Sequence, residues 1–249
     1  FSDESVSGSP FSSGSVKSGA GSPICRVMDC RTVGGSVTAL WIRQVSAEAS
    51  SEELAVTGRE QGWAAGLSPT RSSQFLVSRS WMRSCLATKH GVQPLQVPLE
   101  APPGAPPQLS LGWGYLSLSH CADACLLGWS QQPIGVDLER SDRAIPSALA
   151  LIHRFYRESE QIELRALQAE QLRRQVLDRW LLKEAAIKWQ RGSLAQDLRF
   201  WEVSSTLDCA WHHGLNLKVA AQLRSVKKWR LGIVVGEKKN LQDSLLCLA

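Results

Sequence analysis

Apolar residues recur along this chain with two spacings. In some segments every second residue is apolar, as in strands, and in others apolar residues follow one another at steps of three and four, as in helices. The strand-like segments are residues 37–45, 114–119, 124–129, 134–138, 199–205, 216–223 and 229–235. The helical segments are residues 48–62, 71–90, 145–156 and 169–190. Gly192 fits the end of the last helix, and the prolines of residues 91–110 predict an irregular connection.

The order of these segments predicts an α+β protein of two similar α/β halves, with antiparallel sheets and packed helices. A strand, helices and strands are followed by the same succession, although the sequence itself shows no repeat that proves a duplication. We assign residues 24–130 to an N-terminal half and residues 131–249 to a C-terminal half. Residues 1–23 are mostly serine and glycine, so we expect a disordered tail there.

The composition narrows the class of protein. Hydrophobic residues make up 43% of the chain and the net charge is +5, an ordinary globular profile with a mildly basic balance. No apolar run approaches the roughly 20 residues of a membrane helix, and no nucleic-acid module is visible, so we expect neither a membrane nor a nucleic acid as partner. The seven cysteines form no CxxC pair, which predicts reduced thiols in the cytoplasm.

Two carboxylates lie two residues apart in the segment IGVDLE, which spans residues 134–139. Asp137 and Glu139 share one face of a strand there, while Val136 and Leu138 point toward a core. Adjacent carboxylates repel each other unless a cation or a proton lies between them. Taken alone, such a pair is usually solvated surface.

A second motif lies in the predicted helix of residues 169–190. Trp180, Glu184 and Lys188 follow one another at four-residue steps and therefore share one face. Alone, the Glu-Lys pair is an ordinary surface contact. Together with Asp137 and Glu139, however, Glu184 offers the hard oxygen ligands that Mg²⁺ prefers, and Lys188 can reach a phosphate oxygen that the metal does not cover. No P-loop or Rossmann glycine pattern offers another route to phosphate.

Ser119 and His120 end the predicted strand 114–119 and agree with this reading. His120 can donate to a phosphate oxygen. A lone histidine is more often structural, and that is how we read His212 and His213.

In this order, the three segments resemble the motifs of the 4′-phosphopantetheinyl transferases of the Sfp type. That family carries a Ser-His segment, a G-[VI]-D-x-E strand and a helix with the pattern [WF]-[ST]-x-K-E-[AS]-x-x-K. The matching segments here are SH at 119–120, GVDLE at 135–139 and WLLKEAAIK at 180–188. The similarity runs from about residue 37 to 235. It favours the two-half, monomeric class over the short trimeric acyl-carrier-protein synthases, and it implies a pseudo-dimer of the transferase fold.

The resemblance also implies the reaction. Such an enzyme transfers the 4′-phosphopantetheine group of coenzyme A to a serine of an apo acyl or peptidyl carrier protein, with Mg²⁺ or Mn²⁺, and releases 3′,5′-ADP. Asp137, Glu139 and Glu184 are expected to bind the metal, and Glu184 to take the serine proton. Asp137, Glu184 and Lys188 form the expected catalytic set.

The residues expected to contact coenzyme A are Ser119, His120, Lys183, Lys188 and Arg79. Arg79 is included because Gln74 and Ala105 stand where the family carries an arginine and a lysine. Arg71 and Arg83 are alternative replacements. Leu181 also departs from the motif, at a position where the family prefers serine or threonine.

Two other interpretations stay open. One is a module that binds coenzyme A or a carrier protein with little turnover. The other is a basic interaction protein in which the motifs are coincidental, and it requires Asp137, Glu139 and Glu184 to lie far apart.

Overall fold

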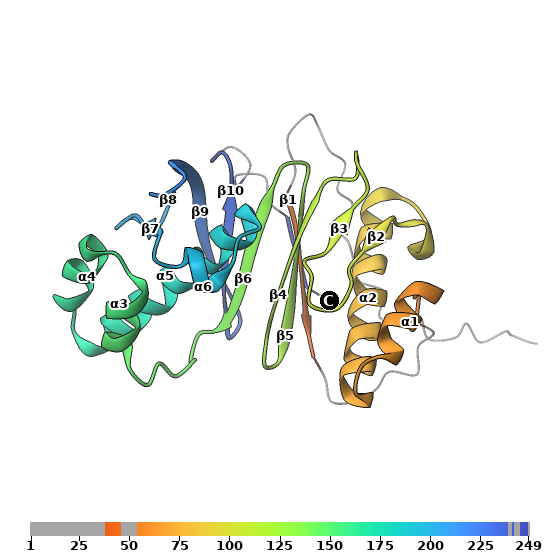
Figure 1. The fold of residues 1–249 in the computed structure, drawn as a ribbon, viewed down its shortest axis with the longest axis horizontal. Helices are drawn as coiled ribbons and strands as arrows, with labels where there is room; N and C mark the ends of the chain where they lie inside the picture. Colours follow the sequence, from red (N-terminus) through yellow and green to blue (C-terminus); the bar gives the residue numbers. More distant parts are fainter. Residues whose placement is uncertain (1–37, 46–53, 239–240, 242–244, 249) are drawn as a thin grey trace, which may run out of the picture.

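The computed structural model describes residues 38–45, 54–238, 241 and 245–248. Two sheets lie face to face, and helices cover the outer face of each (Figure 1). The first sheet has the strand order β11-β1-β5-β4; its strands are β1 (Thr38–Gln44), β4 (Tyr115–Cys121), β5 (Ala124–Ser130) and β11 (Leu245–Leu248). The second has the order β6-β10-β9-β8-β7; its strands are β6 (Ile134–Arg140), β7 (Trp201–Val203), β8 (Cys209–His212), β9 (Leu217–Val226) and β10 (Trp229–Val235).

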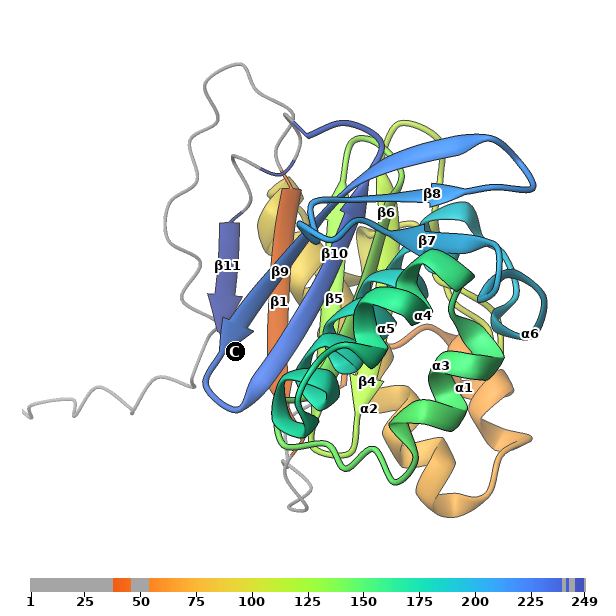
Figure 2. The ribbon, with the colours of Figure 1, turned by 90° about the vertical axis from the view of Figure 1, so that its left-hand side faces the viewer.

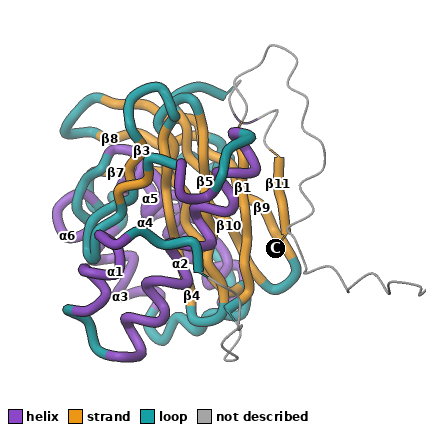
Figure 3. The backbone as a smooth tube through the Cα atoms, turned by 90° about the vertical axis from the view of Figure 1, so that its right-hand side faces the viewer, coloured by secondary structure: helices purple, strands orange, loops and turns teal. Residues whose placement is uncertain are grey.

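Six α-helices complete the described fold. They are α1 (Gly58–Ala65), α2 (Pro69–His90), α3 (Ala148–Phe155), α4 (Glu158–Arg165), α5 (Ala169–Gln190) and α6 (Leu194–Asp197). The 3₁₀ turn η1 (Pro94–Gln96) and the two-stranded ladder of β2 (Leu99–Glu100) and β3 (Gln108–Leu109) lie in the predicted irregular connection. Figure 2 shows α3, α4 and α5 on the side of the second sheet, and Figure 3 shows α1 and α2 on the opposite side. The predicted α+β class with antiparallel sheets and packed helices is confirmed.

The two halves share one plan. Strands β1-β5-β4 are ordered in space as β6-β10-β9 are, and the small ladder β2-β3 has its counterpart in β7-β8. The helix pairs correspond as well, since α4 and α5 each begin 100 residues after α1 and α2 and have the same lengths. Each pair also holds a buried ion pair at matching positions, Arg83–Glu60 at 3.0 Å and Lys183–Glu160 at 2.7 Å. These correspondences show the two similar halves that the order of segments predicted.

Local sequence signals explain where several helices begin and end. A capping box of Thr57 and Glu60 starts α1, and Pro69 occupies the first turn of α2, where its missing N–H costs nothing. Gly91 ends α2 in the left-handed conformation at φ 68°. At the end of α5 that conformation belongs to Arg191, one residue before the predicted Gly192, whose N–H donates to the Ile187 carbonyl at 2.9 Å.

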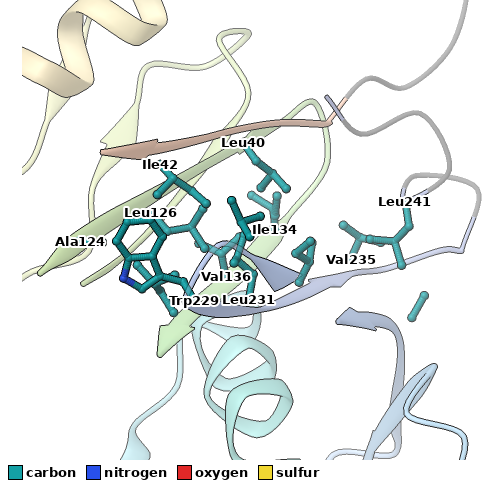
Figure 4. Close-up of a cluster of buried hydrophobic side chains, with 14 residues drawn as sticks. Leu40, Ile42, Ala124, Leu126, Ile134, Val136, Trp229, Leu231, Val235 and Leu241 are labelled. Carbon is teal, nitrogen blue, oxygen red and sulfur yellow. The ribbon is translucent and has the colours of Figure 1, made fainter. Parts of the chain in front are cut away.

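The space between the sheets is filled by a continuous apolar core (Figure 4). Leu40, Ile42 and Leu126 reach it from the first sheet, and Val136 and Leu138 reach it from the second, as the alternation in IGVDLE predicted. Further cores lie between α2 and the first sheet and between α5 and the second sheet. The molecule therefore has four layers in the order helix, sheet, sheet and helix, with an apolar core between each two neighbouring layers.

The edges of the two sheets meet where β4 lies beside β6. The Ser117 hydroxyl accepts a hydrogen bond of 2.9 Å from the Val136 N–H, so a side chain satisfies the free edge of β6. Residues 131–133 alone connect β5 to β6. The boundary assigned at residue 131 stays a prediction. Strand β11 lies in the C-terminal segment of the sequence but pairs in parallel with β1 of the first sheet. The predicted tail 1–23 lies outside the described residues. None of the described helices has the length and apolar character to cross a membrane.

Candidate active site

Two glycines let α5 lie directly on the second sheet. A Cβ at Gly135 of β6 would be 1.8 Å from the Ala185 carbonyl oxygen, and a Cβ at Gly232 of β10 would be 2.7 Å from the Leu181 carbonyl oxygen. Only glycine permits so close an approach of helix backbone to strand backbone. Gly135 precedes Asp137 by one strand period, so the same contact brings the α5 face with Glu184 and Lys188 over the carboxylates of β6.

Three elements converge on the Asp137 carboxylate. The Lys188 ammonium of α5 donates to Asp137 Oδ1 at 2.6 Å, and the Ser119 hydroxyl of β4 donates to the same oxygen at 2.7 Å. Lys188 also donates to the Ser119 oxygen at 2.9 Å, which closes a triangle of polar contacts. Asp137 and Ser119 are buried, whereas the Lys188 side chain is 28% exposed. The triangle joins both halves of the fold and opens to solvent at Lys188.

The second oxygen of the same carboxylate has no partner. Asp137 Oδ2 is buried and accepts no hydrogen bond from any residue that the structure describes. An ionised oxygen in that position carries a large desolvation cost unless a cation meets it. The orphaned oxygen therefore fits the expectation of a cation on this side of Asp137.

Glu184 lies within electrostatic reach of the other acidic groups. Burial, the Asp137 carboxylate and, more weakly, Glu139 raise the pKa of Glu184 to about 7, while the Lys188 ammonium acts in the opposite direction. Like charges held together out of bulk water disfavour ionisation. The three acidic side chains thus influence one another in the fold, although they come from two segments of the sequence.

Glu139 has a partner that its position on the strand did not reveal. It forms an ion pair with Arg143, four residues further along the chain. The pKa of Glu139 is raised, and burial is the largest cause. The Asp137 carboxylate also raises this pKa, whereas Arg143 and Lys188 lower it. The spacing of Arg143 after the strand was visible in the sequence, but its direction depends on a turn in which the Arg143 N–H donates to the Arg140 carbonyl at 3.1 Å.

The acidic side chains are near one another without forming a finished metal site. Across the part of the chain that the structure describes, no three Asp, Glu, His or Cys side chains are arranged to hold one metal ion. Carboxylate oxygens remain the ligands that Mg²⁺ and Mn²⁺ select, and the unpartnered Asp137 oxygen provides a position for one. The ligand set Asp137, Glu139 and Glu184 therefore stays a prediction that the donor chemistry fits.

Lys183 is not part of this site. Its side chain is fully buried, and its ammonium donates to Glu160 Oε2 at 2.7 Å and to the Trp201 carbonyl oxygen at 2.5 Å. It also lies 4.6 Å from the centre of the Tyr156 ring. This placement corrects the expectation that Lys183 contacts coenzyme A, because every direction from its ammonium is closed by protein.

The other two expected contacts also lie apart from the triangle. His120 is exposed, and because side chains alternate along β4 it points to the opposite face from Ser119. Arg79 is buried on α2, where its Nε donates to the Ala101 carbonyl at 2.7 Å and its guanidinium covers the Phe75 ring at 4.1 Å. Arg79 therefore has a packing role, and the structure does not bring it to Asp137.

A hollow of about 680 Å³ lies just beyond the C-terminal end of α5, between Gln190, Asp197, Phe200 and His212. None of the expected site residues lines it. We therefore do not assign it to the acidic site.

Comparison with known proteins gives one family. Residues 133–234 match the family model of the 4′-phosphopantetheinyl transferase superfamily. This stretch contains β6 and α5, which carry Asp137, Glu139, Glu184 and Lys188. The superfamily that the motifs indicated is confirmed for these residues. A search among curated proteins found no match to the chain.

Proposed function

We propose that this chain is a two-half, monomeric transferase of the Sfp type that acts in the cytoplasm. It moves the 4′-phosphopantetheine group of coenzyme A to a serine of an apo acyl or peptidyl carrier protein and releases 3′,5′-ADP. The contact of 2.6 Å between Lys188 Nζ and Asp137 Oδ1 carries the proposal, because these residues are 51 positions apart and come from the two defining motifs. The superfamily match over residues 133–234 agrees with it.

The acidic residues give the site its affinity for a divalent cation. Asp137, Glu139 and Glu184 are the proposed ligands of Mg²⁺ or Mn²⁺. For Asp137 the proposed ligand atom is Oδ2, which has no hydrogen-bond partner among the described residues. When bound, the cation neutralises charge on the pyrophosphate oxygens of coenzyme A.

Glu184 is the proposed general base. A carboxyl group with a pKa of about 7 is partly ionised at neutral pH and is more basic than an ordinary glutamate. It accepts the proton of the carrier serine, whose oxygen then attacks the β-phosphorus. The bond from that phosphorus to the bridging oxygen breaks, and 3′,5′-ADP leaves with the electron pair.

Lys188 and Ser119 act together on phosphate charge. The Lys188 ammonium is held by Asp137 Oδ1 and by the Ser119 oxygen, so its direction is fixed before a ligand arrives. A third donor position of the ammonium remains for a phosphate oxygen. The contact from β4 makes the N-terminal half part of the site.

The second candidate function is a module that binds coenzyme A or a carrier protein with little turnover. Gln74 and Ala105 remove two expected cationic contacts, and Arg79, the expected replacement, is engaged inside the N-terminal half. Calorimetric binding of coenzyme A without release of 3′,5′-ADP favours this candidate.

The decisive experiment is intact-mass measurement of several apo carrier proteins after incubation with the protein, coenzyme A and Mg²⁺. We expect a mass increase of one phosphopantetheine group, and we expect Glu184→Gln to slow loading by about 10²-fold or more, the usual contribution of a general base. Glu170→Gln is the matched control, because Glu170 lies on the same helix and is 79% exposed. Unmodified carriers at saturating coenzyme A contradict the proposal.

A further inference from the structure

Arg143 is a charged residue at the site to which the proposed reaction gives no role. It follows β6 in a turn whose backbone is fixed, since the Ser141 N–H donates to the Lys228 carbonyl at 2.8 Å and the Arg143 N–H donates to the Arg140 carbonyl at 3.1 Å. Its side chain is 43% exposed, whereas that of its partner Glu139 is 19% exposed. A long side chain on a fixed turn can leave its partner without any change in the backbone.

The guanidinium and a cation compete for the same carboxylate. Glu139 is one of the three proposed metal ligands, and Arg143 already occupies one of its oxygens. Two positive groups on one carboxylate repel each other, and that repulsion is strong where burial reduces screening. A divalent cation that reaches Glu139 therefore favours departure of the guanidinium.

The neighbouring arginine cannot take over this role. Arg140 points to the other face of β6, where it donates to Asp142 Oδ1 at 2.7 Å and to Asp123 Oδ2 at 3.0 Å. Asp123 also pairs with Lys228 at 2.7 Å, so that cluster is complete without Glu139. Of the two arginines in this segment, Arg143 is thus the one that pairs with Glu139.

We propose that Arg143 is an exchangeable counter-ion of this site. It neutralises Glu139 while no cation is bound, and after a cation takes Glu139 it turns to an oxygen of the diphosphate group of the substrate. A guanidinium suits both partners, because its planar donors match carboxylate and phosphate oxygens alike. The inference rests on the proposed function for the identity of the diphosphate, whereas the exchange itself concerns only the cation and the two side chains.

The test uses Arg143→Gln and has two readouts of opposite sign. Binding of Mn²⁺ to the protein alone, followed by electron paramagnetic resonance, is expected to become about fivefold tighter, because the competing charge is gone. Binding of coenzyme A at saturating Mg²⁺, followed by calorimetry, is expected to become about tenfold weaker, because one charge-assisted contact is lost.

Two further variants separate this exchange from simpler effects. Arg165→Gln removes an equal charge from an exposed position on α4 and is expected to change neither readout. Arg143→Lys keeps the charge and is expected to bind Mn²⁺ as the unchanged protein does, with coenzyme A binding between the other two. The melting temperature of each variant is compared with that of the unchanged protein to confirm folding.

The outcomes are distinct from those that test the transfer reaction. An Mn²⁺ affinity that Arg143→Gln leaves unchanged, or weaker binding of both ligands, overturns the proposal, the second result showing that Arg143 only maintains the site. If the unchanged protein loads no carrier yet Arg143→Gln tightens Mn²⁺, the exchange stands and the transferase function fails.

Discussion

Glu184 lies on α5 beside a second carboxylate and largely away from bulk water, an arrangement that costs folding free energy whenever Glu184 is ionised. The pKa of about 7 in the fold lies above the ordinary value of 4.5. The folded state therefore binds a proton that the unfolded chain releases between these two values. Its stability contribution is complete below pH 4.5 and is lost as the pH rises through about 7.

Glu184→Gln is accordingly expected to stabilise the metal-free protein at pH 8 by about 1–2 kcal/mol, because the neutral amide removes the buried negative charge. At pH 4.5 the gain is expected to vanish, since Glu184 is then protonated in the fold. Urea unfolding in the presence of a chelator, at both pH values, measures the difference. Glu158→Gln, at an exposed position on α4, serves as the control. A stability gain of equal size at pH 4.5 contradicts the assignment.

At the scale of residues, the sequence predicted the parts of the site that follow from periodicity. Asp137 was expected to share a face with Glu139. The hydrogen bond from Ser119 to Asp137 was not predicted, because Ser119 was expected only to contact coenzyme A. Periodicity shows which side chains share one face of a helix or strand, but it does not show which other elements pack against that face. Lys183 is one residue before Glu184, yet it enters a pocket closed by Glu160 and Trp201, and neither partner is adjacent in sequence. The Arg143 contact depends likewise on the path of a turn.

At the scale of elements, the position of α5 decides whether the site exists. Its backbone touches the sheet through Gly135 and Gly232, and an ion pair of 2.6 Å between Arg230 of β10 and Asp178 of α5 fixes its direction. The buried Asp178 carboxylate gains a bidentate partner there, which makes the contact specific in geometry.

Gly135→Ala is expected to displace α5, because the added Cβ meets the Ala185 carbonyl oxygen at 1.8 Å. The cost is expected to be about 1–3 kcal/mol or more of stability, with at least about a tenfold loss of carrier loading as Lys188 leaves Asp137. Thermal unfolding and intact-mass assays measure the two effects. Gly62→Ala in α1 is the control, since no atom lies within 4 Å of its added Cβ and alanine favours a helix by about 0.5–1 kcal/mol.

Segments with strong periodicity were predicted well and short polar ones were not. The helix 169–190 and the strand 229–235 have the predicted bounds. The helix predicted at 48–62 is found from residue 58 onward, and part of its range lies outside the described residues. Helix α4 was not predicted, because residues 158–165 are mostly polar and its buried residues are only Glu160 and Leu164.

At the scale of the whole molecule, the core between the sheets belongs to both halves. Leu126 of β5 and Leu138 of β6 are each at most 1% exposed and lie in the same cluster. Removing either side chain therefore leaves a cavity that both sheets line.

We expect Leu126→Ala and Leu138→Ala each to cost about 2–5 kcal/mol and to shift one common unfolding transition. Far-UV circular dichroism and tryptophan fluorescence are expected to give coincident urea curves, because tryptophans are buried in both halves. Leu111→Ala, at a fully exposed position, is the control and is expected to stay within about 0.5 kcal/mol. Two separated transitions contradict a shared core.

The sequence indicated two halves but not their exact correspondence. Each helix of the pair α4 and α5 begins 100 residues after its counterpart in the first half and has the same length. The buried ion pairs Arg83–Glu60 and Lys183–Glu160 lie at matching positions of these helices. Arginine and lysine differ at the matching position, so identity is lost while the charge is kept. The pairing of β11 with β1 joins distant segments, and no local pattern announces such a contact.

Among the residues that the structure describes, the short connection 131–133 and the shared core give the two halves no hinge about which to rotate. Ligands therefore enter a rigid frame, and an exposed side chain at its mouth such as Arg143 is the part that moves. Crystals of the protein, once grown, are therefore expected to take up coenzyme A and metal ions by soaking without cracking of the lattice.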